Sequence, residues 1–301
     1  MLSPTRELAM QIHEVFGVLA GAGGLRSALV VGGLSESSQL RALRGGAQVV
    51  VATPGRLGDF MTRKLIRLNA AAIVVLDEAD RMLDMGFLPA IERILSALPP
   101  KRQTMFFSAT IESSVAHLIQ KHSHLPVRIC IGSATKPIDQ VDLHVYEIEQ
   151  EKKLGLLQRM LDRETGSFLV FTRTKHGTDR LAKHLSRSGV KTAGIHGDRT
   201  QNQRNQALDG FKRGQYRVLV ATDVAARGIH VDGIAHVVNY DLPQAPEDFI
   251  HRIGRTGRAG MRGTASTFTT RTERGSITKL ERALKIRLLR RDVLNEIARP
   301  A

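Results

Sequence analysis

Three carboxylates follow an apolar run in the first half of the sequence. Residues 72–76 read Ala-Ile-Val-Val-Leu, and Asp77, Glu78 and Asp80 come directly afterwards. The run predicts a buried strand, and carboxylates crowded at its end need a cation or solvent to neutralise them. Mg²⁺ binds one or two carboxylates while substrate phosphates complete its shell, and a neighbouring carboxylate can orient or deprotonate an attacking water. Asp77 and Glu78 are therefore candidate metal residues, although four such letters by themselves are more often a solvated acidic turn.

Two arginines in the last fifth of the chain are a second chemical candidate. Arg255 and Arg258 lie three residues apart, and each follows a glycine, Gly254 or Gly257. Glycine lets the backbone approach a ligand closely. Guanidinium groups offered across a domain cleft can neutralise charge that develops on a transferred phosphate. The alternative is a glycine-rich basic surface loop.

The charge balance also favours phosphate as a partner. The 301 residues carry 44 Lys and Arg against 29 Asp and Glu, a net charge of +15. Such a chain usually faces phosphate or an anionic membrane, but its longest apolar run, residues 70–76, is far shorter than the ~18 residues of a membrane span. A hydrophobic fraction of 42% excludes whole-chain disorder, and the single Cys130 excludes an internal disulfide or a multi-cysteine zinc site. The cytoplasm is the expected compartment.

The elements that must position these residues alternate along the whole chain. Short β-branched runs are separated by amphipathic stretches, which is typical of parallel βα units in an α/β protein. In the first half we expect strands at 28–31, 48–52, 72–76, 103–107 and 127–131, and a helix at 89–98. In the second half we expect strands at 143–148, 168–172, 192–196, 217–221, 236–239 and 264–268. Open α/β sheets place ligands where such strands end.

A polar stretch with turn residues divides the chain. Residues 132–139 read Gly-Ser-Ala-Thr-Lys-Pro-Ile-Asp, a composition typical of an interdomain linker. We expect domain 1 at 1–133, the linker at 134–140, domain 2 at 141–272 and a basic carboxyl-terminal helix at 273–301. Within 276–291, Ile277, Leu280, Leu284 and Leu288 recur at helical spacing, which favours a helix that docks on domain 2.

Nine ordered motifs from residue 4 to residue 258 resemble those of the DEAD-box ATP-dependent RNA helicases. In the first half they are Pro4-Thr-Arg-Glu-Leu-Ala9, Gly32-Gly33, Thr53-Pro-Gly-Arg56, Asp77-Glu-Ala-Asp80 and Ser108-Ala-Thr110. In the second half they are Phe171-Thr-Arg-Thr174, Gln201 with Arg204, Ala221-Thr-Asp223 through Ala226-Arg-Gly228, and His251 through Arg258. The stretches 81–87 and 172–177 look most like the bacterial RhlE-like members.

The resemblance implies two tandem RecA-like domains with mainly parallel sheets, which use ATP and Mg²⁺. It implies that Asp77, Glu78, Gly228, His230, Arg255 and Arg258 hold the nucleotide and its metal, the two arginines acting as arginine fingers. It further implies that Ser108 and Thr110 bond with Asp80 and with the region of His251, which links nucleotide state to RNA binding. A second Ser-Ala-Thr, at 133–135, lies in the expected linker and receives no role.

RNA is the partner that the resemblance implies, and the residue types fit it. The implied contacts in domain 1 are Thr5, Arg6, Gly33, Thr53, Gly55 and Arg56, and those in domain 2 are Arg173, Gly197, Thr222 and Arg227. Small hydroxyls, exposed backbone N–H groups and guanidiniums hold phosphates without reading bases. Aromatic residues make up only 4% of the chain and Trp is absent, so we expect a sequence-tolerant, backbone-directed contact.

The sequence departs from the family pattern in two places. It has no Gly-Lys dipeptide, and hence no G-x-x-x-x-G-K-[ST] phosphate loop, and Met1 stands three residues before the first motif. We therefore expect domain 1 to be incomplete at its amino terminus and to lack the adenine-recognition segment, with weak or absent ATPase activity. The alternative is a non-hydrolysing RNA-binding or regulatory protein. The second departure is His230, which stands where the family has an Asp that helps to hold the ribose.

His117, His122 and His124 match no zinc spacing, and we expect them to be surface residues.

Overall fold

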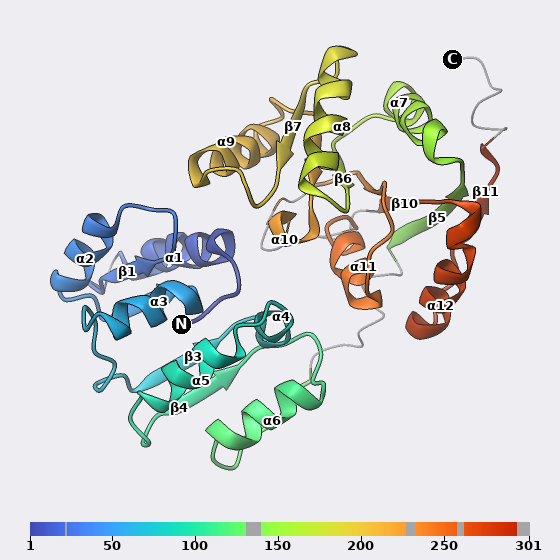
Figure 1. Ribbon diagram of the computed structural model, residues 1–301. Helices are drawn as coiled ribbons and strands as arrows, with labels where there is room; N and C mark the ends of the chain where they lie inside the picture. The colour runs from blue at the N-terminus through green and yellow to red at the C-terminus, as the bar shows by residue number, and fades with distance from the viewer. Residues whose placement is uncertain (22, 131–139, 227–230, 232, 258–261, 294–301) are drawn as a thin grey trace. The chain divides into compact units, whose positions relative to one another are not determined.

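The computed structural model describes residues 1–21, 23–130, 140–226, 231, 233–257 and 262–293 (Figure 1). The chain divides into two units, Met1–Ile131 and Gly132–Ala301. Each unit is an α/β layer whose paired strands are all parallel in the described residues, as the sequence predicts.

The amino-terminal residues join two strand pairs of the first unit into one sheet. Strand β1 (Ser27–Val30) pairs with β2 (Val49–Ala52), and β3 (Ile73–Leu76) pairs with β4 (Gln103–Phe106). Leu2 forms parallel bridges to Ala52 of β2 and Leu76 of β3, and its N–H donates to the Val75 carbonyl at 2.7 Å. Because parallel strands end at one edge, the residues after Leu2 and after each strand lie along the same edge of the sheet.

Helices cover both faces of this sheet. Helix α1 (Arg6–Ala20) packs Ala9 against Val31 and Val51. Helices α3 (Pro54–Thr62) and α5 (Leu88–Ser96) pack on the opposite face, where Leu57, Phe60 and Ile91 meet the alternate strand residues Val74 and Leu76. The remaining helices of the unit are α2 (Glu36–Arg44), α4 (Ala79–Asp84) and α6 (Ser113–His122).

A seven-stranded sheet forms the second unit. Its order is β11 (Leu289–Arg291), β5 (Val141–Glu147), β10 (Gly263–Thr269), β9 (His236–Asn239), β6 (Phe168–Phe171), β8 (Val218–Ala221) and β7 (Thr192–Ile195). Helices α7 (Lys153–Arg163) and α8 (Lys175–Arg187) pack on one face. Helices α9 (Gln201–Lys212), α10 (Asp223–Ala226), α11 (Pro246–Ile253) and α12 (Arg274–Leu284) pack on the other. Two short 3-10 turns, Gln150–Lys152 and Arg271–Glu273, precede α7 and α12.

The expected strand at 127–131 is wrong for the residues that the structure describes. Residues 123–130 contain no strand, and Leu125, Val127 and Ile129 are 79–85% exposed. An alternating apolar run becomes a strand when a neighbouring strand and a packed face satisfy it. In the described part of the unit, this run pairs with no strand, and its apolar side chains belong to neither core cluster.

The expected helix over 276–291 is too long. Helix α12 ends at Leu284, where Lys285 adopts a left-handed conformation with φ of 53°, and β11 then adds to the edge of β5. The predicted apolar stripe is nevertheless docked on the second unit, since Ile277, Leu280 and Leu288 are buried in its core and Leu284 packs against them. The helical spacing extends to Leu288 because this residue is buried in the same core as Ile277 and Leu280, although it lies beyond the end of α12.

His117 and His124 are exposed and His122 is half-buried, and the described residues contain no group of three metal-binding side chains.

Candidate functional site

The acidic turn lies at the carboxyl edge of the first sheet. The Asp77 N–H donates to the Leu2 carbonyl at 2.9 Å, and the Glu78 N–H donates to Asp77 Oδ1 at 3.0 Å. Burial raises the pKa of Asp77, although the bond from the Glu78 N–H lowers it in part. A carboxylate with a raised pKa is one whose charge its surroundings do not fully compensate, which is the state that a bound cation relieves.

Glu78 holds a backbone conformation that few residues with a side chain adopt. Its φ and ψ are 50° and 55°, in the left-handed region, at the residue that precedes α4. Such a conformation costs about 1–2 kcal/mol outside glycine, and strain of this kind gathers at functional sites. It turns the chain sharply between Asp77 on the strand end and Asp80 on the helix.

Asp80 connects this turn to the end of β4. Its Oδ2 accepts hydrogen bonds from the Thr110 N–H at 2.8 Å and the Thr110 hydroxyl at 3.0 Å. The Asp80 N–H donates to Ser108 Oγ at 3.2 Å, and that hydroxyl donates to the Thr110 carbonyl at 2.6 Å. Asp80, Ser108 and Thr110 thus form one network within the first unit. Their expected link to the region of His251, in the second unit, stays a prediction.

The residues proposed for RNA in the first unit follow the neighbouring strand ends. Thr5 caps α1 by accepting from the Leu8 N–H at 3.3 Å and is nearly buried, while Arg6 begins the helix and lies against Gly32. Gly33, at a φ of 79°, makes the turn after β1.

The third motif begins α3 after β2. Thr53 precedes the helix, and Gly55 is exposed in its first turn. Arg56 is ion-paired with Glu36 at 3.3 Å and Asp59 at 3.1 Å and lies over the Phe60 ring. The amino termini of α1 and α3 therefore face the same sheet edge, and helix amino termini attract phosphate. A phosphate ligand would therefore have to share the Arg56 guanidinium with Glu36 and Asp59.

Gln39 is a residue of this site that sequence reasoning missed. Its buried side-chain amide donates to the carbonyls of Val31 at 2.9 Å and Leu34 at 3.3 Å, and its Oε1 accepts from the Val31 N–H at 3.2 Å. These bonds hold the backbone on both sides of Gly32 and Gly33. A glutamine on an amphipathic helix carries no sign of this role in the sequence.

The second unit brings together three of its four predicted RNA residues. Arg173, Gly197 and Thr222 follow β6, β7 and β8, which are neighbours in the sheet and end at one edge. The Arg173 N–H donates to Asp241 Oδ2 at 2.8 Å, and its half-exposed guanidinium reaches Glu273 at 3.4 Å. Thr222 is buried, with 8% of its surface exposed.

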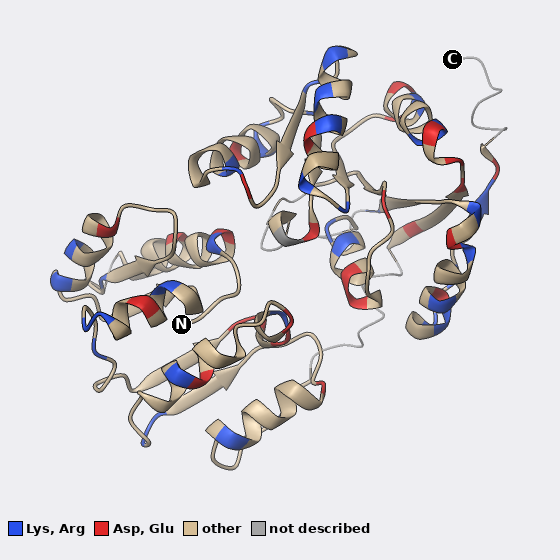
Figure 2. Ribbon diagram, in the orientation of Figure 1, with Lys and Arg blue, Asp and Glu red and all other residues tan. Residues whose placement is uncertain are grey.

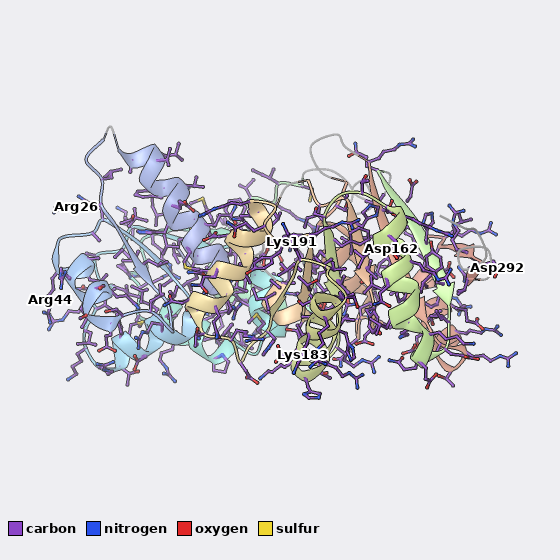
Figure 3. The ribbon with its side chains drawn as sticks, turned by 90° about the horizontal axis from the view of Figure 1, so that it is seen from above. Arg26, Arg44, Asp162, Lys183, Lys191 and Asp292 are labelled. Carbon is purple, nitrogen blue, oxygen red and sulfur yellow. The ribbon has the colours of Figure 1, made fainter. Side chains whose placement is uncertain are left out.

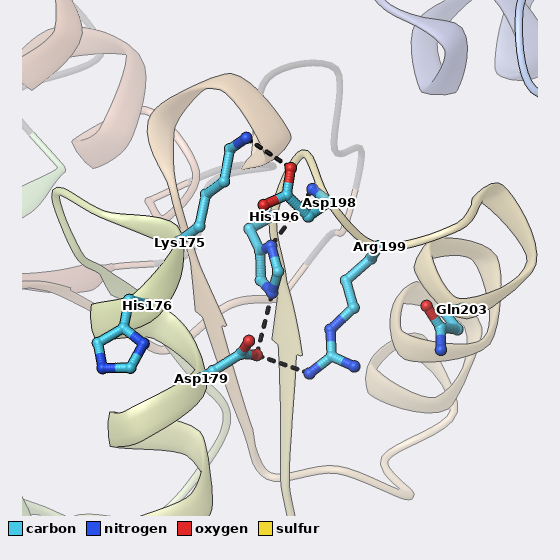
Figure 4. A pocket seen from close by; sticks show the side chains of 7 residues that line it. All are labelled: Lys175, His176, Asp179, His196, Asp198, Arg199 and Gln203. Carbon is cyan, nitrogen blue, oxygen red and sulfur yellow. Dashed lines mark hydrogen bonds and ion pairs between the residues drawn. The ribbon is translucent and has the colours of Figure 1, made fainter.

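A charged cluster supports the loop that carries Gly197 (Figure 4). His196 Nε2 lies 3.0 Å from Asp179 Oδ1, which also accepts from Arg199 at 2.6 Å, and Lys175 pairs with Asp198 at 2.6 Å. The Asp198 N–H donates to His196 Nδ1 at 3.4 Å, so Nδ1 faces a donor while Nε2 faces the Asp179 carboxylate. Burial raises the pKa of Asp179, but the bonds from His196 and Arg199 outweigh it and hold that pKa below its usual value.

Arg252 lies in the motif from His251 to Arg258, and the sequence interpretation assigned it no role of its own. It is buried, and its guanidinium donates to both Asp223 oxygens at 2.6 and 2.7 Å, to Asn239 Oδ1 at 3.1 Å and to the Asp241 carbonyl at 2.7 Å. It also lies over the Phe171 ring. This network fastens α11 to α10 and to the ends of β6 and β9, so it sets where the next loop begins.

His251 lies in the last turn of α11, and Arg255 lies in the loop that follows this helix. Arg255 Nε donates to the His251 carbonyl at 3.2 Å, and both side chains are partly exposed. Arg258, Arg227, Gly228 and His230 lie outside the described residues, as do residues 133–135. Gln201 and Arg204, which form the seventh motif, are buried at the start of α9.

Comparison with known proteins agrees with this geometry. Residues 1–119 match the model of the DEAD/DEAH box helicase family, and residues 152–260 match that of the helicase conserved C-terminal domain. The structure of Saccharomyces cerevisiae Dbp5 L327V bound to RNA and ADP BeF3 is 32% identical and has a TM-score of 0.86. The match covers 99% of this chain and 78% of that one. The chain belongs to the DEAD-box RNA helicase family.

Other members of the family are similar over the same span. A DEAD box protein from Methanococcus jannaschii is 36% identical, with a TM-score of 0.53, over 96% of this chain and 79% of that one. The DEAD-box ATP-dependent RNA helicase CshA of Streptococcus pneumoniae is 41% identical over 85% of this chain and 49% of its own length. The chain thus spans about half the length of the curated relatives that it matches. Among the described residues, no helix is long and apolar enough to cross a membrane.

Proposed function

We propose that this DEAD-box chain grips RNA by its backbone and that the whole protein remodels RNA with energy from ATP hydrolysis. The observation that carries the proposal is the carboxyl edge of the first sheet. There the acidic turn, the Asp80–Ser108–Thr110 network and the amino termini of α1 and α3 follow adjacent strands. Groups suited to phosphoryl chemistry and groups suited to phosphate binding therefore share one edge.

The acidic turn fits a magnesium–nucleotide complex. Asp77 offers an oxygen ligand whose pKa is raised by burial, and Mg²⁺ commonly takes one or two carboxylates beside substrate phosphates. When bound, the ion neutralises phosphate charge. Glu78, next to Asp77, would orient or deprotonate water. Arg255 and Arg258 would neutralise charge on the transferred phosphate, and Gly228 and His230 would line the nucleotide. His230→Asp should tighten nucleotide binding, and an unchanged affinity would count against that role.

The RNA contact would use residues of both units. Thr5, Arg6, Gly33, Thr53, Gly55 and Arg56 would act in the first unit, and Arg173, Gly197, Thr222 and Arg227 in the second. Lys and Arg recur along α8 and α12 (Figure 2). Hydroxyls, backbone N–H groups and guanidiniums recognise phosphate and ribose in any sequence. We further assign the chain to the RhlE-like branch, on residues 81–87 and 172–177.

A second function is favoured by one feature of the sequence. The 301 residues contain no G-x-x-x-x-G-K-[ST] loop, whose amides and lysine hold the β- and γ-phosphates in P-loop enzymes. These residues by themselves could therefore act as an RNA-binding or regulatory protein that does not hydrolyse ATP.

The deciding experiment measures RNA binding and ATP hydrolysis by the 301-residue chain beside its Glu78→Gln variant. We expect RNA binding by both, with hydrolysis by the parent close to the variant's background. RNA-stimulated hydrolysis that Glu78→Gln abolishes would contradict the weak-ATPase expectation and support full enzymatic activity. Loss of RNA binding in both would contradict the proposal itself.

A further inference from the structure

Two cavities, of about 440 and 490 Å³, open beside the start of α8. The larger one shares Arg173 with the edge described above, but this cavity as a whole has been given no role. This larger cavity, of about 490 Å³, lies where α8 meets α7 and the end of β9. It falls within the range of about 300–1,000 Å³ that is typical of ligand pockets. Its lining includes Arg173, Arg180, His184, Leu154, Leu181 and Tyr240.

Helix α8 supplies the basic residues Arg180 and His184 to the lining of this cavity. Gly177, Arg180, Leu181 and His184 recur every three or four residues and so share one face of the helix. Arg180 is exposed and makes no hydrogen bond or ion pair with another described residue. Arg173 enters the cavity lining from the other side, and it is also the first residue of the edge formed with Gly197 and Thr222.

The acidic group in the floor is already compensated. Asp241 Oδ2 accepts from the Arg173 N–H at 2.8 Å, and its Oδ1 lies 3.9 Å from the buried ammonium of Lys153. Lys153 also donates to the Tyr240 carbonyl at 3.0 Å. Asp241 thus fixes the backbone of Arg173. The charge left for a ligand is that of Arg180, beside the guanidinium of Arg173, which a ligand would share with Glu273, and Glu151 also lines the cavity.

Part of the lining is apolar. Leu154, Leu181 and Tyr240 all line the cavity, and the ring centroid of Tyr240 lies 5.9 Å from that of Phe268. Burial raises the pKa of Tyr240 to about 12, so its hydroxyl stays protonated and can donate at neutral pH. Aliphatic and aromatic surface beside guanidiniums is the combination that stacks a nucleobase and pairs with its phosphate.

We propose that this cavity binds one nucleotide of an RNA strand that continues past the edge of Arg173, Gly197 and Thr222. The phosphate lies at Arg173 and Arg180, and the base lies against Leu154, Leu181 and Tyr240. This inference rests on the proposed RNA function and extends it by one subsite. Continuity through Arg173 favours RNA over a protein segment as the occupant, because one side chain belongs to both surfaces.

The test measures the affinity of the 301-residue chain for oligouridylates from about 4 to 12 nucleotides at fixed salt. Arg180→Glu removes the free guanidinium from the cavity. The matched control is Lys183→Glu, which makes the same change of charge at an exposed residue of the same helix outside the cavity lining (Figure 3). Each length series is repeated with one abasic nucleotide at either end.

We expect the parent and Lys183→Glu to gain about tenfold in affinity when the strand becomes long enough to enter the cavity. Arg180→Glu and the abasic strand should lose that gain and bind short strands as the parent does, apart from the small charge effect that Lys183→Glu shares. Equal losses for both variants at every length, or a full gain with the abasic strand, would overturn the subsite. Absence of RNA binding by the parent would instead refute the proposed function.

Discussion

The carboxylate of Asp80 accepts two hydrogen bonds from Thr110, one from its N–H at 2.8 Å and one from its hydroxyl at 3.0 Å. These bonds join the acidic turn after β3 to the loop after β4. Asp80→Asn replaces a charged acceptor by a neutral one, and hydrogen bonds to charged groups contribute about 1.5–3 kcal/mol. We expect the free energy of unfolding of the first unit to fall by about that amount, with faster hydrogen exchange at the Thr110 amide.

Asp84→Asn is the control for this prediction. Asp84 is an exposed carboxylate on the same short helix, 3.9 Å from Arg81. Arg81 is buried, but the Asp84 carboxylate is more than half exposed and solvent screens this long pair, so we expect its loss to cost about 0–1 kcal/mol. Equal exchange rates at Thr110 in both variants would show that Asp80 does not hold the loop.

The pair of Arg252 and Asp223 gives a prediction for the second unit. Arg252 is 2% exposed and donates to both oxygens of Asp223. Asp223→Ala leaves a buried guanidinium without its carboxylate, which typically costs about 3–5 kcal/mol. Adding Arg252→Met should restore part of that loss, because the uncompensated charge disappears. Urea unfolding of the four proteins in this cycle measures the coupling, and additive losses would contradict it.

The side-chain amide of Gln39 gives a prediction for the Gly32–Gly33 turn. Gln39→Met keeps the length of the side chain but leaves the N–H and carbonyl of Val31 without this partner. Each lost partner of a buried polar group costs about 1–3 kcal/mol. Hydrogen exchange at Val31 should accelerate and RNA affinity should fall. Ser38→Ala, on the exposed side of α2, should change neither.

The cluster around Asp179 predicts how the stability of the second unit depends on pH. Bonds from His196 and Arg199 hold the pKa of Asp179 below its unfolded value of about 3.9, despite the opposing effect of burial. Its contribution is therefore fully present above about pH 4 and is lost as pH falls through the lower folded pKa. In Asp179→Asn that acid-dependent loss should be smaller. Unfolding curves between about pH 2 and 6 test this, and identical slopes in parent and variant would refute it.

The order of elements was largely predictable, because apolar strands and amphipathic helices leave a period in the sequence. Ten of the expected strands coincide with observed ones to within two residues at either end, for example 236–239 and 103–107 against Gln103–Phe106. Leu2 was not predictable as part of the sheet, since a single bridging residue has no period. Strand β11 was missed because its residues, Leu-Arg-Arg, gain a partner only when α12 ends at Lys285.

The site was predictable where a motif names its residues and hidden where packing alone gives a residue its role. Asp77, Asp80, Ser108 and Thr110 were all expected, and the structure shows the network that joins the last three. Gln39, Lys153 and Arg252 act through buried polar bonds that no motif names. Gln39 bonds to backbone five and eight residues away, whereas Lys153 bonds to the Tyr240 carbonyl 87 residues away, and neither kind of bond leaves a pattern in the sequence.

The most direct test of the account is the salt dependence of RNA binding by the 301-residue chain. A backbone-directed contact should lose affinity along a straight line of log K against log salt, with a slope of about −0.7 for each neutralised phosphate of a single strand. Uridine-rich and mixed-sequence strands of one length should lie on the same line. A flat curve between about 50 and 200 mM salt, or a strong preference for one sequence, would contradict the account.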